Sequence, residues 1–499
     1  MDVSGILNKA NDNNLNIWGD LGMDKTEGQL LQDRLIYNPK SAWEKTKLEE
    51  KEAAFAFAEE YKDFLNRVKT EREFVAEAEI QAKAAGFLPL EEVVQSGRQL
   101  QPGMKVYSVN RQKAIILAVI GKKNPAEGVN VIGAHIDAPR IDLKRNPVYE
   151  DNGLALLKTH YYGGIKKYQW VTIPLALHGV VIKENGETVN LALGDETDDF
   201  TFTITDLLPH LAHDQMEKKM SEGITGEGLN LLIGSIPYQD EKAENKVKLN
   251  ILRLLNEKYG LVEEDFVSAE LEIVPAFKAK DIGLDRGLVG AYGQDDRVCS
   301  FGAFRALLDL NEVDRTAICL LTDKEEIGSV GNTGAQSRFF ENFLATICAY
   351  SSTGNYQDLV LRDCLSRSKM LSADVNSGVD PNFEGVQDKR NASYLGKGIV
   401  LQKYTGSRGK SGASDANPEY LAALRKLFND HGIAWQTGEI GKVDQGGGGT
   451  IAQYLANLGM EVVDCGVSIL AMHSPYEVTS KIDIYHNYKG NRVFYGWGK

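Results

Sequence analysis

The feature that most constrains the fold is the alternation of apolar, strand-like runs with helical segments after about residue 275. The runs AICLL, KMLSADV and VVDCGVSILAM are typical of strands, and helical stretches such as RVCSFGAFRALLDL and NPEYLAALRKLF lie between them. Helices that connect the strands of a parallel or mixed sheet cover both of its faces. We therefore predict a layered α/β/α domain over residues 276–499.

The first part of the chain adds to this domain, and a middle region interrupts it. Residues 42–86 carry apolar side chains at helical spacing, which predicts one or two amphipathic helices, and the strands AIILAVI and VNVIGAHI follow, joined by the turn NPAEG. Residues 140–275 instead contain short strand-like runs with turn signals, including VTIPLALHGVVI, ENGETVNLAL and DFTFTIT. We predict one α/β domain from residues 1–139 and 276–499, with an inserted β-rich domain at 140–275.

Composition argues against several classes of partner. The chain of 499 residues has a formal net charge of -14, which argues against a general affinity for nucleic acid or for anionic membranes. Its five cysteines are odd in number and form no CxxC pair, so we expect free thiols and a reducing, cytoplasmic compartment. The N-terminus lacks the basic and apolar regions of a signal peptide, and AIILAVI is too short to span a bilayer.

Histidines and carboxylates follow many of the predicted strands. They occur in the strings GAHIDAPR, YGQDDRV, TDKEEIGS, MLSADVN and SILAMHSP. Loops at the carboxyl ends of strands bring residues from distant parts of the sequence into one site. Adjacent acids such as Glu325 and Glu326 repel each other, and burial raises the free-energy cost of their charge, so a divalent cation would explain them. The candidate residues are His135, Asp137, Asp295, Asp296, Glu325, Glu326, Asp374 and His473.

These residue types suit a pair of divalent cations. Imidazole and carboxylate groups bind zinc, cobalt or manganese, and one carboxylate can bridge two ions. A further carboxylate beside the bound water would act as a general base, and a carboxylate next to a ligating histidine would orient its ring. Each motif taken alone is also explained by an exposed acidic pair or a capping aspartate. Their combination in one order is far more specific.

The order HID, DD, EE, SAD and AMHS resembles that of the aspartyl aminopeptidase family of dinuclear metallopeptidases. The longer strings DKEEIGS, LSADVNSGVDPNF, LAMHSPYEV and GGGGTIAQYLANLGMEVVDCG are similar to it as well, from about residue 85 to the C-terminus. The resemblance implies an aminopeptidase that removes the N-terminal residue from peptides. It implies two metal ions per subunit, usually zinc, with cobalt or manganese active in some members. It also implies a homododecamer in which the inserted domain serves oligomerisation or acts as a lid.

The resemblance also implies the metal ligands. His135, Asp295 and Asp374 would hold one ion, and Asp295, Glu326 and His473 the other, so that Asp295 bridges the two.

The remaining roles come from the same resemblance. Glu325 would be the general base that activates water, and Asp137 would orient the ring of the neighbouring histidine ligand. In the family, a histidine of the inserted domain reaches a neighbouring subunit's site, which nominates His178 in PLALHGVVI for substrate binding; the alternative is a core or surface histidine. The family's pocket for acidic side chains uses a lysine where KGIVLQKYTG has Gln402, beside Lys403. This departure weakens the expectation of an Asp or Glu preference and favours a neutral or broad one.

Two other classes of function stay open. The same metal chemistry would serve a deacetylase or another amidohydrolase that acts on N-acyl amino acids. A non-catalytic assembly scaffold is the second alternative, although it would have no use for both Glu325 and Glu326. The string GSRGKSG lacks the first glycine of a phosphate-binding loop, since Tyr404 stands at that position, so nucleotide binding is not expected.

Overall fold

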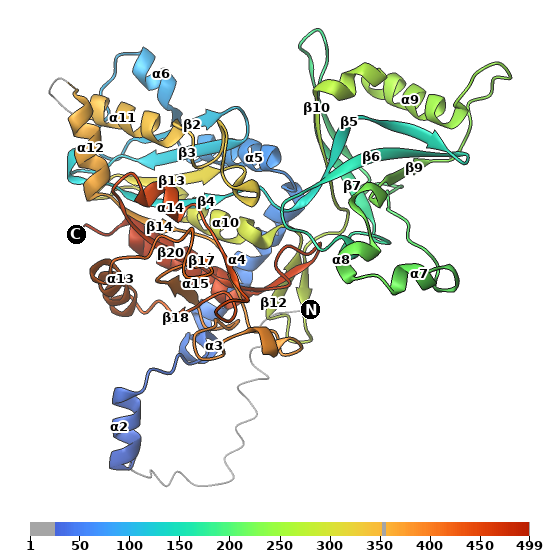
Figure 1. Cartoon of the computed structure of the whole chain (residues 1–499). Coiled ribbons are helices and arrows are strands. Elements are labelled where there is room, and N and C mark those ends of the chain that lie inside the picture. The colour runs from blue at the N-terminus through green and yellow to red at the C-terminus, as the bar shows by residue number, and fades with distance from the viewer. Residues whose placement is uncertain (1–24, 352–355, 499) are drawn as a thin grey trace.

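The computed structural model describes residues 25–351 and 356–498, and its main body is built on a nine-stranded mixed sheet (Figure 1). The N-terminal stretch considered above for a signal peptide lies largely outside the described residues. In spatial order the strands are β1 (Leu88–Pro89), β2 (Lys105–Asn110), β3 (Ala114–Val119), β13 (Ala317–Thr322), β4 (Asn130–His135), β14 (Lys369–Ser372), β20 (Glu461–Gly466), β16 (Ile399–Gln402) and β18 (Trp435–Thr437).

Helices cover both faces of this sheet. Successive side chains of a strand point to opposite faces, and in β3 residues Ile115 and Leu117 enter one hydrophobic core while Ile116 and Ala118 enter another. This arrangement confirms the predicted α/β/α layers. The helices on the first face are α4 (Leu48–Arg67), α5 (Glu71–Ala84), α10 (Gln294–Leu308), α13 (Pro418–Asp430) and α15 (Lys481–Tyr495). Those on the second face are α6 (Leu90–Gln95), α11 (Phe339–Ser351), α12 (Asp358–Arg367) and α14 (Ala452–Ala456).

Helices α4 and α5 fulfil the prediction for residues 42–86, and two short helices, α2 (Glu27–Leu35) and α3 (Ala42–Lys45), precede them. The aromatic face of α4 packs on α10, where the rings of Phe64 and Phe301 have centroids 5.0 Å apart. Thr70 and Glu73 form a reciprocal capping box that starts α5. Within residues 25–351 and 356–498, no helix combines the length and apolar character needed to cross a bilayer.

The strand order creates the edge on which the candidate site lies. Strands β3 and β4, joined through the turn NPAEG, do not pair with each other, because β13 lies between them. β13 runs antiparallel to β3 and parallel to β4, and β14 is parallel to β4 on the other side. The carboxyl ends of β13, β4 and β14 therefore meet at one edge of the sheet.

A second, six-stranded antiparallel sheet stands beside the main body, with its own hydrophobic core (Figure 1). The string DFTFTIT, predicted to be a strand, forms isolated bridges: Phe202 pairs with Leu175, and Thr203 pairs with Leu232. This described segment therefore does not form the predicted strand. In spatial order the strands are β8 (Thr188–Leu193), β7 (Leu175–Ile182), β10 (Ala269–Pro275), β5 (Arg140–Asp151), β6 (Leu154–Tyr162) and β9 (Leu231–Gly234). The accompanying helices are α7 (His213–Met216), α8 (Met220–Gly223) and α9 (Lys246–Tyr259).

Two smaller sheets complete the structure. The apolar stretch EVVDCGVSILAM divides into β20 of the main sheet and a strand of a five-stranded sheet. The five strands are, in spatial order, β11 (Lys280–Ile282), β12 (Leu288–Ala291), β22 (Glu477–Ser480), β21 (Ser468–Leu470) and β15 (Asn376–Ser377). A two-stranded ladder pairs β17 (Gly406–Ser407) with β19 (Gly447–Gly448).

Candidate metal centre

The five predicted metal ligands converge beside the carboxyl ends of β4, β13 and β14. His135 is the last residue of β4, Glu326 lies just beyond β13, and Asp374 lies two residues beyond β14. The other two come from the neighbourhood of the five-stranded sheet: Asp295 is in the first turn of α10, after β12, and His473 follows β21. Two sheets therefore supply the site, and the sequence separation between its ends exceeds three hundred residues.

Asp295 lies between the two histidines. Its Oδ1 is 3.3 Å from His135 Nε2, and its Oδ2 is 3.1 Å from His473 Nε2. Further carboxylates flank each histidine, with Asp374 Oδ1 3.9 Å from His135 Nε2 and Glu326 Oε2 3.6 Å from His473 Nε2. One carboxylate is thus shared by two clusters, each with one imidazole and one additional carboxylate, which is the donor set that two adjacent cations require.

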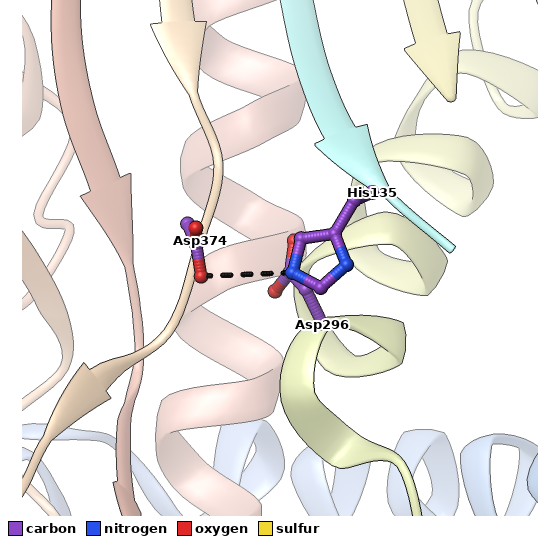
Figure 2. A group of neighbouring side chains, drawn as sticks. All are labelled: His135, Asp296 and Asp374. Atoms are coloured by element: carbon purple, nitrogen blue, oxygen red, sulfur yellow. Dashed lines mark ion pairs between the residues drawn. The ribbon is translucent and has the colours of Figure 1, made fainter. Parts of the chain in front are cut away.

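Asp296 also belongs to the first cluster, although the sequence patterns predicted no metal-binding role for it. Ligand atoms of His135, Asp296 and Asp374 lie within 4.8 Å of one another (Figure 2). Another cluster of this kind is the predicted set of Asp295, Glu326 and His473, and a third consists of His135, Glu325 and Glu326. Asp295 remains the better candidate for a bridging ligand, because its two carboxylate oxygens lie 3.3 Å from His135 Nε2 and 3.1 Å from His473 Nε2.

Burial makes this cluster costly unless a cation balances it. Both carboxylate oxygens of Asp296 and Oε1 of Glu326 are buried without a hydrogen-bond partner among the described residues. Burial, followed by neighbouring carboxylates, raises the pKa of Glu326 and of Asp296 well above the usual range. Burial likewise raises the pKa of Glu325 to about 7. Unpaired buried carboxylates cost free energy, and divalent cations would neutralise them, so the residues present fit a metal centre.

Asp137 fixes the orientation of His135. His135 Nδ1 lies 3.0 Å from the Asp137 backbone oxygen and 3.3 Å from its Oδ1. The backbone N–H groups of Glu325 and Glu326 donate to the two carboxylate oxygens, at 3.1 and 3.2 Å. This arrangement favours a proton on Nδ1 and leaves Nε2 free to bind a cation. It also places the Glu325–Glu326 turn against the histidine.

Residues 64–495 match the family model for the aminopeptidase I zinc metalloproteases, M18. The chain belongs to the M18 family of aminopeptidases. It is 53% identical over 460 residues to a probable M18 family aminopeptidase 1 from Clostridium acetobutylicum, with 92% of this chain and 98% of the relative covered.

Solved structures of relatives show the same fold. An M18 aminopeptidase from Thermotoga maritima superposes with a TM-score of 0.87 at 45% identity, and the match covers 92% of this chain and 99% of that one. The dodecamer of S. cerevisiae mApe1 superposes with a TM-score of 0.71 at 24% identity, covering 88% and 96%, which shows a likeness of fold. The predicted family, fold class and enzyme class are confirmed: the chain is an M18 metalloaminopeptidase.

The M18 aminopeptidase has a cavity of about 910 Å³ next to the candidate metal centre. Glu326 and Ile327 form one side of it, and residues of β5, β6 and β10 form the other. The six-stranded sheet therefore forms part of the wall of the cavity that Glu326 lines.

His178, nominated for substrate binding, lies in β7 and is 4% exposed. Its Nδ1 is 2.7 Å from Glu73 Oε1, and its Nε2 is 3.1 Å from Asp195 Oδ2. Burial lowers its pKa, but these two carboxylates outweigh burial and raise it to about 9. The structure of one chain thus gives His178 a structural ion pair and does not bring it to the metal centre. Its role at a neighbouring subunit's site stays a prediction.

Gln402 ends β16 and is 1% exposed. Its Oε1 accepts a hydrogen bond of 2.8 Å from Nδ2 of Asn376, which lies two residues beyond Asp374. The neighbouring Lys403 is partly exposed and pairs with Asp415. The position beside the segment that carries Asp374 is therefore occupied by the neutral amide of Gln402. The neighbouring Lys403 is paired with Asp415.

Three contributors were not among the residues predicted from the sequence. Glu477 accepts hydrogen bonds from the backbone N–H groups of Asp295 and His473, at 3.1 and 2.7 Å, and so holds two ligands together. Tyr162 and Gly164, at the end of β6, contact the centre from the six-stranded sheet. The DD pair was a signal for Asp296, but nothing local in the sequence indicated that the other three residues face the site.

Proposed function

We propose that this M18 aminopeptidase hydrolyses the first peptide bond of peptide substrates with the help of two zinc ions held by His135, Asp295, Asp374, Glu326 and His473. The position of Asp295 between the two histidine rings is the observation that carries the proposal, since it supports a bridging role. Cobalt or manganese would suit the same nitrogen and oxygen donors. Bound in this centre, the ions would polarise the scissile carbonyl and lower the pKa of water.

Glu325 is the proposed general base. It lies in the turn held by Asp137, and burial raises its pKa to about 7, which suits a group that takes and returns a proton near neutral pH. In this proposal Glu325 takes a proton from the attacking water and passes it to the nitrogen of the leaving amine. Asp137 keeps His135 in the tautomer that binds through Nε2.

The first test is the variant Glu325→Gln. Because the amide cannot accept the proton, we expect turnover to fall by a factor of about 10² to 10⁴ while zinc content and assembly stay at wild-type values. Glu312→Gln is the matched control, since the Glu312 side chain is 70% exposed and pairs with Lys122 at 2.8 Å. Unchanged peptide hydrolysis by Glu325→Gln would refute the proposed base and revive the scaffold alternative.

The proposed substrates are peptides with neutral or varied N-terminal residues. The neutral, buried Gln402, hydrogen-bonded to Asn376, supports this preference over an acidic one. Zinc-loaded enzyme should release Leu and Ala from unblocked peptides faster than Asp or Glu, and chelator should abolish the release. Confinement of cleavage to Asp and Glu would overturn the preference. Release from N-acyl amino acids alone would favour the amidohydrolase alternative.

We also propose that residues 140–275 form an inserted domain that serves assembly into a homododecamer. The six-stranded sheet spans this segment, and the S. cerevisiae relative is a dodecamer, which supports the proposal. Light scattering should then give about twelve times the chain mass of 55.0 kDa. A mass equal to one or two chains would refute it.

The five cysteines are free thiols, which supports a cytoplasmic location.

A further inference from the structure

The segment that leaves β6 of the six-stranded sheet touches both halves of the proposed metal centre. The Tyr162 hydroxyl donates a hydrogen bond of 2.8 Å to Asp137 Oδ2, and the carbonyl oxygen of Gly164 lies 3.0 Å from His473 Nδ1. Gly163 lies between them with φ +72°, and a Cβ there would come within 3.3 Å of the Cβ of Glu326. The segment is therefore fitted to the site at three consecutive positions.

The Tyr162 hydroxyl completes the hydrogen bonds of Asp137. Oδ1 of Asp137 faces His135 Nδ1 and the Glu325 N–H, while Oδ2 accepts from the Glu326 N–H at 3.2 Å and from Tyr162. Because each oxygen is engaged by partners on a different side, the carboxylate is held in one rotational position. Without the hydroxyl, Oδ2 would keep only the amide bond, and the carboxylate could turn away from the histidine.

The ring of Tyr162 is itself held by a buried cation. Arg140, opposite Tyr162 in the β5–β6 ladder, places its guanidinium carbon 3.9 Å from the ring centroid. Arg140 is 3% exposed, and its Nε lies 3.0 Å from Glu272 and 2.9 Å from Asp142. These acids lie on β10 and β5, so the position of the hydroxyl is set by the frame of the six-stranded sheet.

We infer that Tyr162 is a positioning residue for the aminopeptidase reaction, through which the six-stranded sheet fixes Asp137 and, in turn, the metal-binding face of His135. The inference rests on the proposed role of His135 as a metal ligand. Tyr162 acts only through Asp137 and need not touch the substrate.

The variant Tyr162→Phe tests this inference, because it removes one hydroxyl and keeps the ring beside Arg140. In the full chain, titrated with zinc against a chromophoric chelator, we expect about a tenfold weaker zinc affinity, and about a tenfold lower kcat with KM within twofold of wild type. Tyr149→Phe is the control, since Tyr149 lies at the other end of the same ladder, beside Leu156. It should keep wild-type zinc affinity and kcat.

A double-mutant cycle separates positioning from general loosening of the fold. In an Asp137→Asn background, Tyr162→Phe should lower zinc affinity by less than twofold further, because its route to His135 is already broken. A full additional tenfold loss there, or wild-type zinc affinity in Tyr162→Phe itself, would overturn the inference. The variant His135→Ala separates failure of the proposed centre from failure of the role of Tyr162. Wild-type zinc affinity in His135→Ala would refute the proposed centre as a whole. Weakened zinc affinity in His135→Ala together with wild-type affinity in Tyr162→Phe would refute only the role of Tyr162.

Discussion

Asp295 and His473 differ in how much of the proposed metal centre depends on them. Asp295 presents one oxygen to each histidine, whereas Nε2 of His473 faces Asp295 and Glu326. Exposure differs as well, since the side chain of His473 is 35% exposed and that of His135 only 2%. The cluster of Asp295, Glu326 and His473 is therefore the one that a substitution of His473 can remove without disturbing the cluster around His135.

This asymmetry predicts different metal contents for two variants. His473→Ala should keep about one zinc ion per chain, because His135 and Asp374 remain, whereas Asp295→Asn should weaken the binding of both ions. Elemental analysis of equilibrated, dialysed protein measures the stoichiometry. Two ions retained by Asp295→Asn would contradict the bridging role.

At the residue scale, sequence patterns predicted the cluster by type and order, but not all of its members. His135, Glu326 and Asp374 follow strands whose ends could be expected to meet, because the strands are apolar and buried. Glu477 accepts a hydrogen bond from Asp295, 182 residues away, and Tyr162 donates one to Asp137, 25 residues away. Such partners depend on the packing of separate sheets, which local periodicity does not encode.

At the scale of elements, His486 links α15 to two distant segments. It is 2% exposed, its Nδ1 accepts the Ala434 N–H at 3.2 Å, and its Nε2 lies 3.1 Å from the Thr46 hydroxyl. This bonding requires a neutral ring that donates through Nε2. Burial, and next the nearby Lys489, lowers its pKa from 6.5 to about 4.

The lowered pKa of His486 predicts a pH-dependent stability. Its contribution is fully present above pH 6.5 and is lost as the pH falls towards 4, because the unfolded chain takes up a proton that the folded chain excludes. The full effect is on the order of 3 kcal/mol. Melting curves should therefore show a smaller fall in Tm between pH 7 and pH 4.5 for His486→Gln than for wild type. His213→Gln is the control, since His213 is 80% exposed; equal pH profiles for wild type and His486→Gln would contradict the prediction.

Element order was less predictable than element type. The strands and helices of the main body are indicated by apolar runs and helical spacing, but the insertion of β13 between β3 and β4 is not. The chain leaves the main sheet at Arg140 and pairs β13 only after returning from the second sheet, so this pairing is set by long-range packing. DFTFTIT has strand-like alternation, yet the hydroxyls of Thr201 and Thr203 donate to backbone oxygens of residues 173–175, and the segment makes isolated bridges to Leu175 and Leu232 in place of a continuous ladder.

For the whole molecule, metal binding should act as a cross-link. The proposed ligands run from His135 to His473 and come from two sheets, so bound ions would add a direct link between segments that are far apart in the chain. Ions that bind only the folded chain add about 2.7 kcal/mol at a concentration one hundred times the Kd. Chelation should therefore lower the Tm, and stoichiometric zinc should restore it. A calorimetric Tm that does not change on chelation would contradict this expectation.

The contacts made by Tyr162, Gly163 and Gly164 bear on protein engineering. A shortened enzyme that joins residue 139 directly to residue 276 would keep every proposed metal ligand, yet it would lose the support behind Asp137, Glu326 and His473. The six-stranded sheet is thus no detachable module of this enzyme. A chimera that borrows the sheet from another M18 aminopeptidase would need a Tyr-Gly-Gly segment in the same place, or a redesigned replacement for it.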